Sequence, residues 1–385
     1  MAEVLDVQDV LRETQDRVRR AYGAAIGRRR DEVITPALIL DLPAAQRNID
    51  IVAQRVRGLT ADLRPHIKVH KSPQLARMQL EAGAIGLSVA TVWEAIVMAG
   101  SGAGSVFVVN TIAGEEKLAA LAALAREAEV MLAVDDAVNV TAAADAARAA
   151  GSTIGIVIEV DTGMDRAGVD TTEEAVALAR HVADLDGVTL LGVTGYEGHC
   201  SMTFEADLRR QRLDQAMDFL VETAEAIRAE GLPAPIVSAG GTATWDWTAA
   251  YPGVTEIQAG TYVVMDHYHA QMVAGFEHSL TVLTTVISRR PDRVIVDAGN
   301  KSVGAPALTS IKGHDLVNRR FDEEHGIFAA SPADGLSVGD VVELIPGYSS
   351  ATVNWYDAYH VVEDDRVVDI WPVIPRGPGH GGLLR

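Results

Sequence analysis

A lysine inside a run of cationic side chains is the first feature of the sequence that could carry chemistry. Residues 64–71 read Arg-Pro-His-Ile-Lys-Val-His-Lys, so Lys68 has Arg64, His66 and Lys71 as near neighbours. Neighbouring positive charge lowers the pKa of a lysine and frees its amine to attack an aldehyde. We therefore interpret Lys68 as a Schiff-base lysine, the alternative being an ordinary exposed lysine at a strand end.

Two glycine-containing turns could bind a phosphate group. The run Ser238–Thr244 includes Gly241 and Thr242, and a later turn contains Gly260 and Tyr262. Backbone N–H groups in such turns can approach a phosphate closely, although a glycine pair after a strand is more often simple turn geometry. Combined with a nucleophilic lysine, the two turns predict a phosphorylated aldehyde as the cofactor.

Two more polar side chains follow strand-like runs. Arg166 lies in a glycine-containing loop, where it could bind a phenolic oxygen or a carboxylate, or form a surface ion pair with Asp161 or Asp165. Tyr196 could transfer a proton or stack on a ring, or it could be a hydrogen-bonded core residue.

Alternating elements would have to bring these residues together. From Pro36 to about Gly240, apolar runs of strand length alternate with periodic runs of helix length, and the pairs Thr91/Glu94 and Thr171/Glu174 have capping-box spacing. We expect strands at Ala37–Leu42, Leu63–Lys68, Gly86–Ala90, Ser105–Asn110, Val130–Asp135, Gly155–Asp161, Thr189–Tyr196 and Pro235–Gly240. Eight strand–helix units predict an α/β fold, a (β/α)8 barrel whose active site lies at the carboxyl ends of its strands.

The chain divides into three predicted segments. Residues 1–34 carry a charged helical pattern, Val4–Arg30, that could pack on either domain, and residues 35–270 form the barrel. After about Asp266, strand-like runs follow one another without long helices between them, which predicts a smaller, mostly β domain over residues 271–385. The strands expected there are Leu280–Ser288, Arg293–Asp297, Val341–Leu344, Ala358–Val362 and Val367–Trp371.

Composition narrows the class of function. The formal net charge of −20 over 385 residues would repel a phosphate backbone, so we expect no nucleic-acid partner. No apolar run of about 18 residues suggests a membrane span, and the first residues lack a signal-peptide pattern. A lone cysteine, Cys200, excludes an internal disulfide and points to a reducing compartment, so we expect a cytoplasmic protein.

Longer motifs, spread from Thr35 to about Gly377, together carry a family resemblance. They are Thr35–Asp41, Arg64–Lys71, Glu159–Gly168, Gly195–Gly198, Ser238–Thr242, Gln258–Tyr262 with Met265 and Asp266, Asp297–Gly299 and Glu324–Gly326. In these motifs the chain resembles the D-threonine aldolase and D-serine dehydratase family, relatives of alanine racemase among the fold type III pyridoxal-phosphate (PLP) enzymes.

The resemblance implies roles for the candidate residues. Lys68 would hold PLP, Arg166 would lie near the ring oxygen of the cofactor, and Tyr196 would lie beside the ring. The phosphate would be held by Gly241, Thr242, Gly260 and Tyr262. The resemblance also implies a small-molecule amino acid as substrate, and a homodimer whose active sites are completed by the partner's β domain.

One segment departs from the family pattern. The family's metal ligands lie in a segment Pro-Gly-His-x-Asp (or Cys)-Pro-Thr-Val-Asn, but Pro346–Asn354 here has Tyr348 and Ser350 in place of both ligands. Neutral tyrosine and serine are poor ligands for zinc, manganese or magnesium, so we expect no metal at the usual site. A substitute site could be drawn from His199, His267 and His269, although histidines this close in sequence are more often coincidence.

The resemblance implies a PLP-dependent lyase that cleaves the Cα–Cβ bond of a D-β-hydroxy-α-amino acid to glycine and an aldehyde. The departure at Pro346–Asn354 implies that this chain would do so without the family's metal. The β-hydroxyl proton would then pass to a side chain, and the candidates are His66, His199, His325 and Tyr348 of the partner subunit. An amino-acid racemase or epimerase is the main alternative, since it needs only Cα–H chemistry between two bases. A dehydratase is less favoured because a leaving hydroxide needs an electrophile, and a non-catalytic PLP-binding protein is the least favoured reading.

Overall fold

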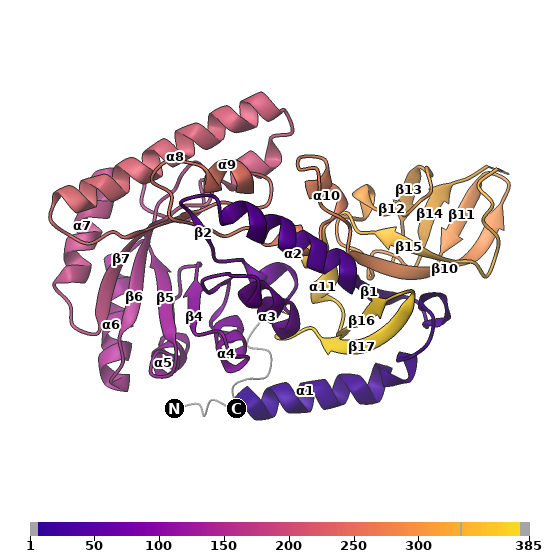
Figure 1. The fold of residues 1–385 in the computed structure, drawn as a ribbon, viewed down its shortest axis with the longest axis horizontal. Coiled ribbons are helices and arrows are strands. Elements are labelled where there is room, and N and C mark those ends of the chain that lie inside the picture. The colour runs from indigo at the N-terminus through magenta and orange to yellow at the C-terminus, as the bar shows by residue number, and fades with distance from the viewer. Residues whose placement is uncertain (1–6, 332, 378–385) are drawn as a thin grey trace.

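The structure is a computed structural model that describes residues 7–331 and 333–377 (Figure 1). Residues 4–6 of the predicted N-terminal helix therefore lie outside the described residues. Within the described part the chain forms two sheets, one of eight parallel strands and one of nine strands. The predicted parallel barrel followed by a mostly β region is confirmed.

The parallel sheet forms the barrel. Its order is β2-β9-β8-β7-β6-β5-β4-β3, and a parallel bridge between His66 and Ser88 joins the segment after β2 to β3, so the sheet closes. The strands are β2 (Asp62–Leu63), β3 (Leu87–Val89), β4 (Ser105–Val108), β5 (Glu129–Val134), β6 (Ile154–Glu159), β7 (Val188–Thr194), β8 (Ile236–Ala239) and β9 (Glu256–Ile257).

Helices surround this barrel; most bury one apolar face, and α4 is buried on every side over Val92–Met98. They are α2 (Leu42–Val56), α3 (Pro73–Glu81), α4 (Val92–Gly100), α5 (Glu115–Leu124), α6 (Ala137–Ala150), α7 (Thr172–Ala183), α8 (Ala206–Ala229) and α9 (Trp245–Ala249). In α7 the buried residues Ala175, Leu178, Ala179 and Val182 follow helical spacing. The predicted capping box is present, because the Thr171 side chain accepts from the Glu174 N–H and Glu174 accepts from the Thr171 N–H.

Alternation along the strands divides the barrel interior into layers. Arg64 and Glu256 form a buried ion pair near the amino ends of the strands, with Arg64 Nε 3.0 Å from a Glu256 carboxylate oxygen. Phe107, Met131, Ala133 and Val157 form an apolar cluster of their own. Two residues beyond Arg64, Val157 and Glu256 come His66, Glu159 and Gln258, which the two-residue period of a strand places on the same inward face. The sequence thus aims polar side chains at the carboxyl end of the barrel.

The nine-stranded sheet corrects the expected position of the first strand. β1 (Ala37–Asp41) pairs antiparallel with β10 (Leu280–Arg290) and parallel with β16 (Ala358–Glu363), so it belongs to this second sheet. The eighth barrel strand is the short β9, which the strand predictions missed. The other strands of the second sheet are β11 (Arg293–Val296), β12 (Ser310–Ile311), β13 (Asn318–Phe321), β14 (Gly326–Ala329), β15 (Val341–Ile345) and β17 (Arg366–Pro372).

The N-terminal helix α1 (Val7–Tyr22) runs along β17, beneath the second sheet as Figure 1 is drawn. Its Val18 is buried with Ile39 and Ile370 of that sheet. Arg19 forms an ion pair with Asp369 at 2.9 Å. No helix among the described residues is long and apolar enough to cross a membrane.

Candidate active site

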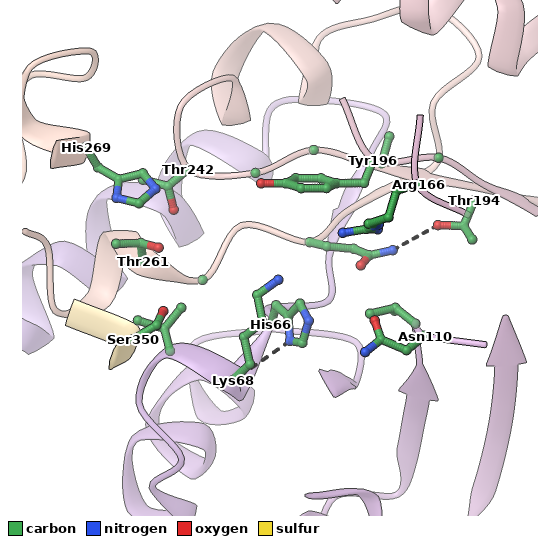
Figure 2. Close-up of a pocket in the computed structure, with 18 of the residues that line it drawn as sticks. His66, Lys68, Asn110, Arg166, Thr194, Tyr196, Thr242, Thr261, His269 and Ser350 are labelled. Atoms are coloured by element: carbon green, nitrogen blue, oxygen red, sulfur yellow. Dashed lines mark hydrogen bonds between the residues drawn. The ribbon is translucent and has the colours of Figure 1, made fainter. Parts of the chain in front are cut away.

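Lys68 lies in a cavity at the carboxyl end of the barrel, on the short 3-10 helix η3 (Ile67–Val69) that follows β2. The prediction that Lys68 belongs to a strand is wrong, because β2 ends at Leu63 and the chain then turns inward. Figure 2 shows the Lys68 amine pointing into the cavity between His66 and Tyr196.

A buried hydrogen-bond chain fixes the lysine turn. The His70 ring accepts from the Ser72 N–H and bonds to Gln79 Oε1 at 3.2 Å, and Gln79 Nε2 donates to the Tyr262 hydroxyl at 2.7 Å. His70, Gln79 and Tyr262 are all fully or almost fully buried. The chain therefore ties the turn that carries Lys68 to the turn after β9.

The charge around Lys68 differs from the sequence expectation. Burial lowers the pKa of Lys68, and the nearby Arg166 guanidinium lowers it further, whereas Glu94 acts in the opposite direction. Arg64 is neutralised by Glu256, and Lys71 Nζ lies 2.6 Å from a Glu94 oxygen. Desolvation, with Arg166 as the cationic neighbour, is therefore what frees the amine.

Arg166 and Tyr196 both lie beside the lysine. The Lys68 amine and the Arg166 guanidinium are each 5.6 Å from the centre of the Tyr196 ring. Arg166 also lies 3.4 Å from a carboxylate oxygen of Glu159, so its side-chain partner is neither Asp161 nor Asp165. Burial raises the pKa of Tyr196 to about 12, so its hydroxyl stays protonated near neutral pH.

His66 is a neutral, buried ring in the cavity wall. Its Nδ1 accepts from the Lys68 backbone N–H, so the ring proton sits on Nε2, which has no partner among the described residues. Burial and the Lys68 charge hold the His66 pKa well below its usual value. His66 can therefore donate a hydrogen bond into the cavity but is a poor base.

The two glycine-containing turns meet at the cavity. Gly241, Thr242 and Gly260 line it, and the backbone N–H groups of Thr242 and Gly260 donate no hydrogen bond to any described residue. A Cβ added at Gly260 would lie 2.2 Å from the His66 carbonyl oxygen, so only glycine fits there. The Thr242 hydroxyl accepts from the Tyr262 N–H at 3.1 Å, which holds the two turns together.

The segment that departs from the family pattern forms another wall of the cavity. Tyr348 and Ser350, at the start of α11 (Ser349–Asn354), line the cavity of their own chain, so Tyr348 need not come from a partner subunit. His269 in α10 (His267–Ala270) lines it too, and its ring stacks on Tyr348 with centres 6.0 Å apart. Burial, with Asp266 as a negative neighbour, raises the Tyr348 pKa.

Three predicted site residues lie outside the cavity wall. His199 contacts Cys200, with Nε2 3.7 Å from Sγ. His325 is exposed in the turn between β13 and β14, two strands that Figure 1 shows in the part of the second sheet away from the barrel. The Tyr262 side chain is fully buried, and its hydroxyl is engaged by Gln79.

The structure does not bring His199, His267 and His269 together as a metal site. Among residues 7–331 and 333–377, no group of three or more His, Cys, Asp or Glu residues is placed to hold a metal ion.

Two features of the cavity show that its residues fit PLP. His66 Nε2 and Glu159 Oε2 are buried polar atoms that lack a partner among the described residues and flank the lysine. The small residues at positions 241, 242 and 260 leave room for a phosphate near free backbone N–H groups. A group with a polar ring and a phosphate would satisfy both features.

Sequence reasoning missed part of the wall. The cavity is also lined by Glu159, Asn110, Thr194 and Gln258, to which the sequence assigned no role. Of these, Glu159 and Gln258 lie in the motifs Glu159–Gly168 and Gln258–Tyr262 that carry the family resemblance. Gln258 Nε2 donates to the Thr194 hydroxyl at 3.2 Å (Figure 2). Each follows or ends a barrel strand, so position at the carboxyl edge is the signal that could have found them.

Comparisons with known proteins agree with this geometry. The family model described as the alanine racemase N-terminal domain matches residues 40–267, and one described as a serine dehydratase domain matches residues 279–362. The chain is 36% identical over 355 residues to D-threonine aldolase of an Arthrobacter species, covering 90% of this chain and 93% of that protein. It is 33% identical over 364 residues to 3-hydroxy-D-aspartate aldolase of Paracoccus denitrificans strain Pd 1222, covering 91% and 94%.

A solved structure gives the same result. The crystal structure of D-threonine aldolase from Filomicrobium marinum superposes with a TM-score of 0.87 at 32% identity, covering 90% of this chain and 96% of that chain. Since the match spans both the barrel and the second sheet, the chain belongs to the family of D-threonine aldolase and its relatives, within the alanine racemase fold type.

Proposed function

We propose that this protein is a PLP-dependent lyase that cleaves a D-β-hydroxy-α-amino acid to glycine and an aldehyde, without a metal at the family's usual position. The observation that carries the proposal is the composition of the cavity. It contains a desolvated Lys68, two glycine-containing turns with room for a phosphate, and the segment in which Tyr348 and Ser350 stand in place of the family's metal ligands. The similarity to aldolases over nine-tenths of the chain supports the reaction class.

Different residues of the cavity wall would bind different parts of the cofactor. Lys68 would bind it covalently, and the backbone N–H groups of Thr242 and Gly260, with the Thr242 hydroxyl, would hold its phosphate. Gly241, whose own N–H donates to the Thr244 hydroxyl, would leave room for it. Arg166 and Tyr196 would contact the ring. Bound PLP supplies the electron sink that accepts the pair released when the Cα–Cβ bond breaks.

The substrate needs contacts of its own. Its carboxylate must be held close to Lys68, and Arg166 is the permanently charged donor in that part of the cavity. Two of the predicted candidate bases, His66 and Tyr348, line the cavity, but both are protonated at the atom that faces it near neutral pH. They would donate hydrogen bonds to the substrate or cofactor.

We propose a cytoplasmic homodimer as the working form. Figure 1 shows the second sheet standing beside the barrel, with its far end extending away from it. An exposed stretch with Met202, Phe204 and Leu208 lies just after the cavity strand β7. A second copy could cover this stretch and supply a residue such as His325 to the active site.

Racemisation is the second candidate, and one observation favours it. Lys68 and Tyr348 line the same cavity, so two proton carriers could act on one Cα. Dehydration remains the third outcome, since the serine dehydratase domain model also matches the chain.

A product screen distinguishes the three reactions. Purified holoenzyme would be incubated with D- and L-threonine, serine, alanine and 3-hydroxyaspartate, and aldehyde, glycine, keto acid and the opposite enantiomer would be measured. We expect aldehyde and glycine in equal amounts from D-β-hydroxy amino acids. Keto acid with ammonia, or exchange of enantiomers alone, would reject the aldolase.

The cofactor lysine has a separate test. Lys68→Ala should abolish the absorption band of covalently bound PLP, and borohydride reduction of the wild type should label the peptide that contains Lys68. A Lys68→Ala protein that keeps the band would contradict the assignment, and Lys71→Ala, with a lysine three residues away, is the matched control.

A further inference from the structure

His269 lies in the wall of the active-site cavity, and the proposed function leaves it without a role. Its ring is buried, lines the cavity and stacks on Tyr348. Thr242 and Thr261 line the same cavity, and Figure 2 shows all three side chains at its edge.

Asp266 fixes the protonation pattern of the ring. His269 Nδ1 lies 2.7 Å from Asp266 Oδ1, and the other Asp266 oxygen accepts from the Ser349 N–H and hydroxyl, both at 2.9 Å. Although burial alone would raise the Asp266 pKa, the hydrogen bond from His269 and the backbone donors lower it, so Asp266 is a carboxylate. A carboxylate accepts, so Nδ1 carries the ring proton and Nε2 presents a free lone pair.

His269 Nε2 makes no hydrogen bond to any described residue, and the ring faces the cavity. This is the opposite tautomer from His66, whose Nδ1 accepts and whose Nε2 therefore bears the proton. Of the two cavity imidazoles, only His269 can take up a proton from a bound molecule.

The other titratable groups of the wall are less suited to that task. Lys68 binds the cofactor and would exchange protons at Cα rather than at the β-hydroxyl, and Arg166 cannot lose its proton. Tyr196 and Tyr348 have raised pKa values, which keeps both phenols protonated. Glu159 could accept a proton, but it is paired with Arg166, beside Tyr196.

We propose that His269 is the general base of the lyase and that Asp266 positions it, an assignment that rests on the proposed function. In the cleavage step the β-hydroxyl proton moves to His269 Nε2, the oxygen electrons form the aldehyde C=O bond, and the Cα–Cβ bond breaks. PLP held by Lys68 would supply the electron sink for the released pair, and a proton from solvent added at Cα would complete glycine. The Asp266–His269 pair thus performs the proton transfer in a cavity where Tyr348 and Ser350 stand in place of the family's metal ligands.

The test compares two reactions of one enzyme. His269→Gln should release aldehyde from a D-β-hydroxy amino acid about 100-fold or more slowly than wild type, because one general base contributes about 10²–10⁴-fold. The same variant should still exchange the Cα hydrogen of glycine in D2O, since glycine has no β-hydroxyl. PLP affinity of the apoprotein and the absorption band of the bound cofactor should match those of wild type.

His267→Gln is the matched control, because it changes a histidine of the same short helix that does not line the cavity. Asp266→Asn should lower kcat for aldehyde release and leave KM and the glycine exchange unchanged, which a merely structural role would not do.

Three outcomes would overturn the proposal. The first is aldehyde release by His269→Gln near the wild-type rate, and the second is a large loss in Tyr348→Phe or Glu159→Gln while His269→Gln stays active. The third is a loss of PLP affinity in His269→Gln that accounts for its lower rate, which would make the ring a phosphate contact. If wild type itself releases no aldehyde from any substrate, the proposed function fails instead.

Discussion

At the scale of single residues, the phosphate turn depends on one close approach. Gly260→Ala would place a methyl group 2.2 Å from the His66 carbonyl oxygen, so the backbone must shift away from the cavity. A shift of this kind costs about 1–3 kcal/mol. If the shift weakens cofactor binding by that amount, the affinity for PLP falls about 10- to 100-fold. We expect PLP titration of the apoprotein to show this loss. Gly104→Ala, where an added Cβ meets nothing within 4 Å, should bind PLP like wild type.

Residue types alone located the core of the site. The run around Lys68 and the glycine pairs stand out in the sequence because few other functions need a nucleophilic lysine and a phosphate turn together. The Tyr262 side chain does not line the cavity, because its hydroxyl is bound by Gln79 Nε2 in the core, which the sequence around it could not show. His269 drew attention only as a metal ligand, since its pairing with Asp266 depends on the turn of α10.

At the scale of elements, a buried ion pair between Arg64, which follows β2, and Glu256 of β9 stabilises the interior of the barrel. Arg64 and Glu256 have side-chain exposures of 6% and 3%, and Arg64 also donates to Ser105 at the start of β4. Glu256→Ala would leave the guanidinium buried and unpaired, which costs about 3–5 kcal/mol. Urea denaturation should show this loss, and Glu230→Ala, which breaks an exposed pair with Arg180, should show a far smaller one. Equal losses in the two variants would contradict the role of the buried pair.

Periodicity predicted most of the elements but could not assign β1. Its apolar run reads like any parallel strand, and its place between β10 and β16 is set by residues about 240 to 320 positions later in the chain. β9 has only two paired residues, too few for a pattern to show. Strands β5 and β6 are predictable because their buried apolar runs are nearly continuous, and β7 and β10 because they are long and rich in β-branched and other apolar residues.

At the scale of the whole molecule, buried histidines should make stability depend on pH. Burial lowers the His70 pKa to about 4 from an ordinary value of 6.5, and it lowers the His66 pKa as well. Between pH 6.5 and about 4 the unfolded chain therefore binds protons that the folded protein does not. The contribution of these rings to the free energy of unfolding is complete above pH 6.5 and is lost as pH falls toward 4. For His70 this amounts to about 3 kcal/mol.

Denaturation at a series of pH values checks this expectation. The unfolding free energy of the wild type should fall steadily as pH drops below 6.5. In His70→Asn this fall with pH should be less steep at pH values above those at which carboxylates titrate. A wild-type curve that is flat between pH 7 and about pH 5 would contradict it.

The central claim is that this molecule cleaves a D-β-hydroxy amino acid in the Lys68 cavity without the family's metal ligands. The most direct test is to treat the PLP-loaded enzyme with a chelator, remove the chelate, add D-threonine, and measure glycine and acetaldehyde over time. The account predicts equal amounts of both products at a rate that added manganese, magnesium or zinc does not raise. No cleavage until a metal is restored, or a rate that rises in proportion to bound metal, would contradict it.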